Sequence, residues 1–188
     1  MDAVALLGNR VRAVSGAVRG AVEAVAGQDW SVAVAPGTSP IGLTLWHLPR
    51  VQDWLVQTTI RGAAEVVDRP EFAALPDPDS FGFGTGLSPE QAKEAAAAID
   101  RDTLLAYADA VGDEIESWLA TMTGADLDQV VPEFMDRQQT RPGYCTPAAL
   151  KEIEHLPGLP IGMLLLRPAI SHVFIHLGEI ETLTQLGR

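Results

Sequence analysis

Apolar residues recur every three or four positions along the first part of the chain, which is the spacing of one face of an α-helix. The stripe runs through Val4, Leu7, Val11, Val14, Val18 and Val22. It predicts a long amphipathic helix over residues 3–26, ended by Gly27 and the Gln28-Asp29-Trp30 segment.

A second helix is predicted from Ser39, as N-cap with Pro40 at the first helical position, to about Ile60. Pro49 should kink this helix or remove one backbone hydrogen bond, because proline has no N–H. Arg61-Gly62 should end it. The following residues 62–87 are rich in proline and glycine and predict a long loop, held to the body by Phe72, Phe81 and Phe83.

A third helix is predicted to begin at Ser88-Pro89-Glu90-Gln91, which has the composition of a capping box, and to end at Gly124. Its apolar stripe is Leu104, Ala108, Val111, Ile115, Trp118 and Met122. Residues 124–146 are predicted to be irregular. A short helix follows from Thr146 to about His155, and a fourth long helix covers 162–186, with Pro168 as a kink or first-turn residue.

Four long helices with long connections predict an all-α, four-helix bundle with crossover loops. The length of 188 residues fits a single domain, 1–188.

Composition narrows the possible functions. A net charge of −12 argues against a nucleic-acid partner, which would show itself by salt-sensitive DNA binding. Cys145 is the only cysteine, which excludes an intrachain disulfide and fits a reducing compartment. No uninterrupted apolar run has the length of a membrane span, and the N-terminus lacks the features of a secretory signal. We therefore expect a cytoplasmic protein with no membrane partner.

The chain has four histidines, and two of them, His172 and His176, lie four residues apart on the predicted last helix. This spacing places both imidazoles on one face, as two ligands of one metal ion require. His47 on the second helix is also expected to point inward and is a candidate third ligand. The alternative is that these are core histidines bonded to each other or to carbonyls. Glu152-x-x-His155 is half of a di-iron motif, but no second copy exists, so a di-iron site is not expected.

Two segments, Ser39 to Leu55 and Ser171 to Ile180, resemble the DinB-like (DinB/YfiT) superfamily of metal-binding four-helix bundles, in particular its uncharacterised and mycothiol-dependent branches. The first is similar to the family's second helix, where a histidine ligand precedes a leucine. The second is similar to the family's H-x-x-x-H-x-G signature, with Gly178 as the glycine.

The resemblance implies a divalent metal, nickel or zinc, held by His47, His172 and His176, a small-molecule substrate, and a homodimer. Metal coordination deprotonates a thiol, which suits a low-molecular-weight-thiol S-transferase that uses mycothiol or bacillithiol. The alternative is a non-enzymatic homodimeric metal-binding bundle. The chain departs from the family's pattern at Pro49-Arg50 and at Gln52-Asp53, and these changes affect the expected substrate contacts rather than the ligands.

Four other polar residues are candidates for a role in the site. Glu179 lies one turn after His176 and either orients that imidazole or is simply a polar residue at the bundle edge. Arg50 and Asp53 have the i,i+3 spacing of an ion pair on a helix surface. Cys145 has no histidine near it in sequence and is not expected to be a nucleophile.

Overall fold

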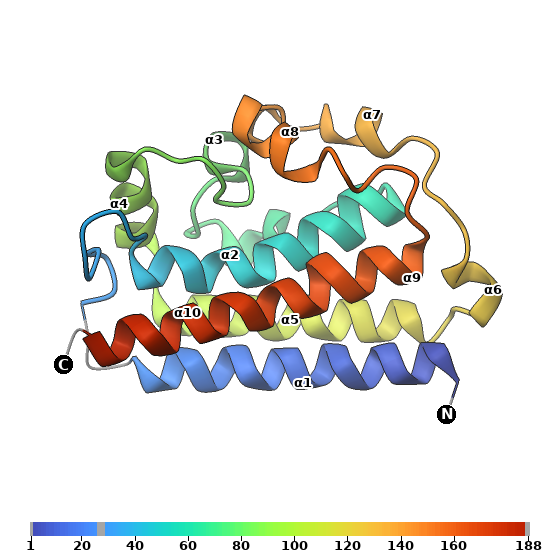
Figure 1. Cartoon of the computed structure of the whole chain (residues 1–188), viewed down its shortest axis with the longest axis horizontal. Coiled ribbons are helices and arrows are strands. Elements are labelled where there is room, and N and C mark those ends of the chain that lie inside the picture. The colour runs from blue at the N-terminus through green and yellow to red at the C-terminus, as the bar shows by residue number, and fades with distance from the viewer. Residues whose placement is uncertain (1, 26–28, 187–188) are drawn as a thin grey trace.

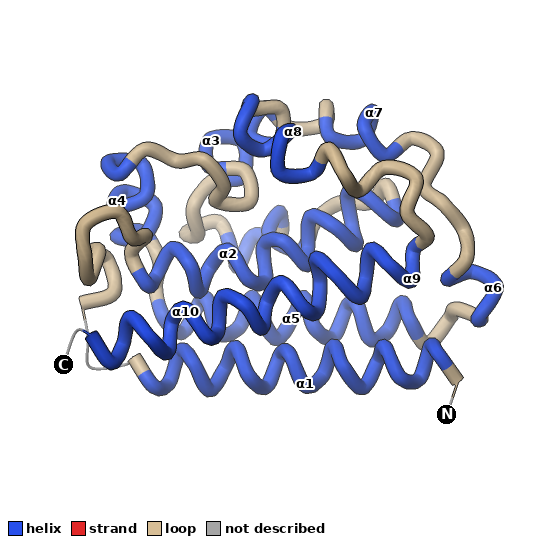
Figure 2. The backbone as a smooth tube through the Cα atoms, in the orientation of Figure 1, coloured by secondary structure: helices blue, strands red, loops and turns tan. Residues whose placement is uncertain are grey.

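Four long helical rods dominate the computed structural model, which describes residues 2–25 and 29–186 (Figure 1). The first rod is α1 (Ala3–Ala24), the second is α2 (Ile41–Asp53) continued by the π-helix η1 (Trp54–Arg61), and the third is α5 (Arg101–Leu119). The fourth joins α9 (Ile161–Leu164), the π-helix η5 (Leu165–Ser171) and α10 (His172–Leu186). The described residues contain no strand, so the all-α prediction is confirmed (Figure 2).

The four rods form a bundle in which α1 and α2 each pack against both α5 and α10. α1 and α10 run in one direction and α2 and α5 run in the other (Figure 1). Because α2 and α5 are parallel, the chain between them must return along the length of the bundle. This is the long crossover connection that the sequence predicts.

The connections carry short helices that cover one side of the bundle (Figure 1). Between η1 and α5 lie η2 (Val66–Asp68), η3 (Pro70–Phe72), α3 (Pro78–Phe81) and α4 (Pro89–Ala98). Between α5 and α9 lie α6 (Gly124–Leu127), α7 (Phe134–Gln138), η4 (Pro142–Tyr144) and α8 (Pro147–Ile153). As predicted, phenylalanines hold the first connection to the body, because Phe72 and Phe83 are buried and Phe81 is half-buried against the core.

The predicted stripe of α1 forms part of the core, since Leu7, Val11, Val14, Val18 and Val22 are all buried. α1 and α5 approach each other closely at Gly112, where an added Cβ would lie 2.5 Å from Oγ of Ser15. Gly62 ends η1 in the left-handed region with φ of 62°, as predicted for the end of the second rod.

The predicted boundaries of two helices are wrong. The stretch from Ser88 to Gly124 is not one helix, because Ile99 is extended and Asp100 starts α5 as an N-cap that accepts from the Thr103 amide at 2.9 Å. A side chain that satisfies a free helix-start amide favours a new helix over continuation of the old one. The second rod begins at Ile41 with Pro40, not Ser39, at the N-cap position. The predicted end of the first helix at Gly27 and Gln28 lies outside the described residues.

Among the described residues, the segment Ile161–Leu186 is long and apolar enough to cross a membrane by length and composition alone. The expectation that no segment has this character is therefore too strong for the last rod. In the bundle this rod packs along α1 and α2, and core helices of soluble proteins also have such a composition.

Candidate metal centre

Three histidines from two antiparallel rods meet in the bundle. His47 comes from α2 and is buried, while His172 and His176 come from α10 and are half-buried. The ring centres are 5.3 Å apart for His47 and His172, 5.0 Å for His47 and His176, and 4.5 Å for His172 and His176. One nitrogen from each ring lies within 4.8 Å of the other two, which is compatible with a single metal ion.

The tautomer of His47 is set by the backbone of the crossover connection. Its Nδ1 forms a short hydrogen bond to the carbonyl oxygen of Phe83, and because a carbonyl can only accept, Nδ1 carries the proton. The Nε2 atom therefore presents its lone pair to His172. Burial lowers the pKa of His47 to about 3, an effect to which the neighbouring histidines and Arg50 add and which the Phe83 carbonyl opposes. The imidazole is neutral at physiological pH, as a metal ligand must be.

The pair His47 and His172 fits a metal ion. Their Nε2 atoms lie 3.0 Å apart, and two nitrogens bound to one metal at 2.0–2.1 Å with angles near 90–109° are separated by about 2.9–3.4 Å. Burial, followed by the charges of His176 and Arg167, lowers the pKa of His172 to about 4. Three imidazoles form a donor set that suits zinc and nickel.

His176 is oriented by Glu179, whose Oε2 accepts from its Nδ1 at 2.8 Å. This leaves Nε2 of His176 free on the side opposite the carboxylate. A carboxylate bonded to the outer nitrogen of a ligand histidine fixes the ring and makes it a stronger donor. Of the two interpretations of Glu179, the structure therefore favours the orienting one.

Two cavities adjoin the three histidines and share His47, Thr85, Glu152 and His172 as lining residues, and together we call them the histidine cleft. The outer compartment, of about 200 Å³, also contacts His176 and Glu179. The inner compartment, of about 70 Å³, is walled by Trp54, Phe83 and other apolar residues and by His155 and Arg167. The metal candidates thus border a cavity that can admit a small molecule.

The prediction that Arg50 and Asp53 form a surface ion pair is wrong, because both side chains are fully buried. Arg50 donates to Asp53 at 3.1 Å, to Glu65 at 3.0 Å and to the Tyr107 hydroxyl at 2.9 Å, and it also bonds Tyr144. The connection after η1 places Glu65 beside α2. The Arg50 guanidinium is therefore paired with two carboxylates of the fold instead of being hydrated by water.

This buried network, defined by Arg50, Asp53, Glu65, Tyr107 and Tyr144, supports the centre indirectly. The Tyr144 ring stacks on Phe83 with centres 5.7 Å apart, and Phe83 holds Nδ1 of His47. Spacing could not reveal Glu65, Tyr107 or Tyr144, because they come from separate elements. The other departure from the family pattern, Gln52, is also buried and donates to the Ala169 carbonyl of η5 at 2.8 Å, which ties the two histidine-bearing rods together.

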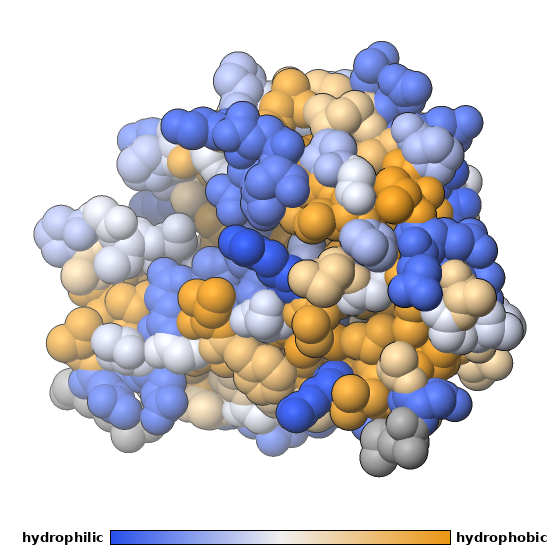
Figure 3. Space-filling view, turned by 45° about the vertical axis from the view of Figure 1, so that its right-hand side comes forward, coloured by the Kyte–Doolittle hydropathy of each residue, from blue (hydrophilic) through white to orange (hydrophobic). Residues whose placement is uncertain are grey.

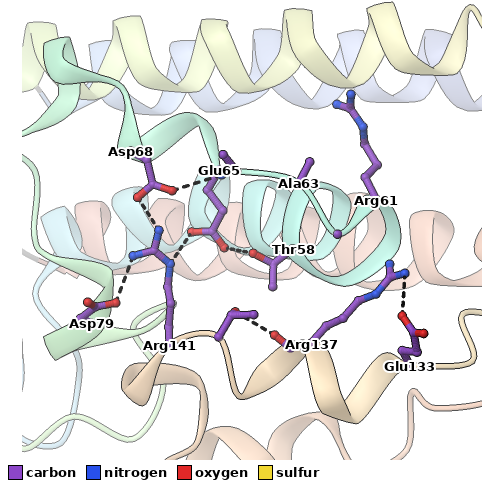
Figure 4. A pocket seen from close by; sticks show the side chains of 12 residues that line it. Thr58, Arg61, Ala63, Glu65, Asp68, Asp79, Glu133, Arg137 and Arg141 are labelled. Carbon is purple, nitrogen blue, oxygen red and sulfur yellow. Dashed lines mark hydrogen bonds and ion pairs between the residues drawn. The ribbon is translucent and has the colours of Figure 1, made fainter.

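A larger cavity than either compartment of the histidine cleft, of about 630 Å³, lies at the far end of η1 (Figure 4). Its charged walls are internally paired: Arg141 contacts Glu65, Asp68 and Asp79, and Arg137 contacts Glu133. Cys145 lines neither this cavity nor the histidine cleft, and its thiol donates to the Gln138 carbonyl at 3.3 Å. Neither feature adds a catalytic group to the three histidines.

Comparison with known families agrees with this architecture. The family model of the DinB superfamily matches residues 10–155, which include His47 and leave His172 and His176 beyond the matched range. No curated protein matches the chain. Because the family model covers most of the sequence and the observed fold is the all-α one it implies, the chain belongs to the DinB superfamily.

Proposed function

We propose that this protein is a metal-dependent enzyme that transfers a low-molecular-weight thiol, such as mycothiol or bacillithiol, to a small electrophilic substrate in the cytoplasm, as a homodimer of single-domain subunits. The observation that carries the proposal is the convergence of three imidazoles on one point beside a cleft. Nickel or zinc is the metal that this donor set favours.

The chain's own residues would hold and shape such a centre. Phe83 keeps the proton of His47 on Nδ1, Glu179 keeps that of His176 on Nδ1, and both arrangements leave the lone pair of Nε2 available to a metal ion. When bound, the metal ion supplies Lewis acidity that favours the thiolate form of a thiol. The apolar wall at Trp54 and Phe83 limits water around the reacting groups.

The alternative is a metal-stabilised bundle that catalyses nothing, for which a closed coordination sphere with a fourth protein ligand would be expected. Among the described residues, the cluster of possible ligands contains the three histidines and no further donor. A site with open positions favours the enzyme over the purely structural role.

Metal content tests the centre directly. Wild-type protein loaded with Zn²⁺ or Ni²⁺ and then dialysed should retain one equivalent per chain by elemental analysis, and His172→Ala and His176→Ala should lose it. His155→Ala is the matched control, because His155 lines the same cleft outside the cluster and should retain the metal. Absence of stoichiometric metal from the wild type would overturn the proposal.

The activity is tested separately, by incubating loaded protein with mycothiol or bacillithiol and a panel of electrophiles. We expect thiol conjugation that depends on the metal and is abolished in His176→Ala. A protein that holds the metal but conjugates neither thiol would support the alternative, non-enzymatic role.

A further inference from the structure

Arg167 is brought to the histidine cleft by the π-helix η5. The backbone N–H of His172 donates to the Arg167 carbonyl five residues earlier, which is the π-type hydrogen bond. In a regular α-helix, residues five apart point about 140° away from each other, whereas the wider π-turn brings them toward the same side. Both side chains line the inner compartment. π-Bulges of this kind occur frequently at functional sites.

The inner compartment is bordered by a solvent-exposed guanidinium, that of Arg167, which no carboxylate of the fold pairs with. Within residues 2–25 and 29–186, the side chains of Arg167 and His155 form no hydrogen bond or ion pair, while the three arginines around the large cavity are each paired with a carboxylate. The rest of the inner wall is largely apolar, formed by Val51, Trp54, Phe83, Ile153, Leu156 and Pro168. An apolar pocket with one free guanidinium is a site for a molecule with an apolar body and one anionic group.

The acidic residues of the cleft fix which end receives the anion. Glu152 stands where the two compartments meet, and Glu179 lies in the outer one, so a carboxylate placed beside either would be repelled. The protein carries a net charge of −12, so binding of an anion has to rest on a local cation. Arg167 supplies that cation at the solvent-exposed edge of the inner compartment.

We propose that Arg167 is the anion-binding residue of the histidine cleft and that the substrate is a small carboxylate with an apolar body. The carboxylate pairs with the guanidinium, the body lies against Trp54 and Phe83, and the reactive end points toward His47 and His172. This inference rests on the proposed function for the identity of the site, and it adds the class of substrate.

The test uses benzoate as the probe and benzamide as its uncharged analogue of the same shape, titrated calorimetrically into metal-free and zinc-loaded protein. In metal-free wild type we expect benzoate to bind about threefold to fivefold more tightly than benzamide, since an ion pair with an exposed guanidinium contributes a preference of this size. Arg167→Gln should remove that preference and leave benzamide binding unchanged. Arg10→Gln, which removes an exposed arginine on α1 outside the cleft, is the matched control and should retain the preference.

Arg167→Lys provides a variant that keeps the charge and should retain most of the preference for benzoate if the glutamine variant folds poorly. Equal binding of the two probes to metal-free wild type, or an unchanged preference in Arg167→Gln, would overturn the proposal. Binding of benzoate only to the zinc-loaded protein would also overturn it, because the anion would then be recognised by the metal. Since the decisive arm uses metal-free protein, its outcome is independent of whether thiol transfer occurs.

Discussion

His47 and His172 stay neutral in the fold at pH values where an exposed histidine takes up a proton. Burial is the main cause, and it lowers the pKa of His47 to about 3 and that of His172 to about 4. Neutrality makes both rings available as metal ligands without a competing proton. It also means that acid should destabilise the metal-free fold, because these two histidines become protonated in the unfolded chain at pH values where they stay neutral in the folded chain.

We therefore expect the melting temperature of the metal-free protein to fall between pH 7 and pH 5. Both folded-state pKa values lie below the unfolded value of 6.5, so the stability they contribute is present above pH 6.5 and is lost as the pH falls toward 4 and 3. His47 contributes about 1.4 kcal/mol per pH unit within this window. Asp53 opposes the trend below about pH 6, because burial raises its pKa to about 6.

Scanning calorimetry of metal-free wild type and His47→Gln from pH 7 to pH 5 separates this contribution from that of the many carboxylates. The melting temperature of the variant should fall less steeply with decreasing pH, since only one of the two buried histidines, His172, remains to be protonated on unfolding. Parallel declines in the two proteins would show that His47 is not a protected neutral group.

The sequence predicted the ligand residues to different degrees. The four-residue spacing of His172 and His176 predicts a shared helix face from local geometry alone. The assignment of His47 as the third ligand needed the family resemblance. His47 lies on a different rod from His172 and His176, and the contact between the two rods is set by the whole fold. The structure brings the three rings together, while metal binding itself stays a prediction.

At the level of elements, the connection after η1 is where sequence reasoning failed most. The i,i+3 spacing of Arg50 and Asp53 is correct for a pair on one helix, but it carries no information about what covers that helix. Glu65 and Tyr144 reach Arg50 from positions 15 and 94 residues away. The length of the connection was predictable from proline and glycine, whereas its docking over the second rod was not.

Arg50→Met should destabilise the fold by about 3–5 kcal/mol, because it leaves Asp53 and Glu65 buried without their cation. Arg12→Met is the control: it removes an arginine from an exposed pair with Glu116, where the Arg12 side chain is 65% exposed, and should cost no more than about 1 kcal/mol. Urea unfolding at pH 7 measures both. Similar losses in the two variants would mean that the buried network contributes nothing beyond a surface ion pair.

For the whole molecule, the bundle was predictable because apolar stripes and helix-start signals predict four long helices, and each amphipathic helix needs a partner to cover its apolar face. The periodicity did not predict that the last rod also carries apolar side chains on its solvent-exposed side. Met163, Leu166, Phe174 and Ile175 are large apolar residues exposed on it. Figure 3 shows how apolar surface alternates with polar surface on one face of the molecule. Exposed apolar side chains gathered on one helix favour burial in an interface, and a second copy of the same rod would cover them through a two-fold axis.

We expect the protein to form a homodimer through this exposed side of α9, η5 and α10. Light scattering after size exclusion should give about twice the chain mass of 20.0 kDa at micromolar concentration. Ile175→Arg should shift the mass to that of one chain, because Ile175 is 69% exposed and its charged replacement would be buried without a partner at the interface. Met135→Arg, at an apolar residue that is 39% exposed on α7, a helix that packs on η1 rather than on the last rod, should leave the dimer intact. Retention of metal by Ile175→Arg would show that the neighbouring His176 is undisturbed, and a monomeric wild type would refute the dimer.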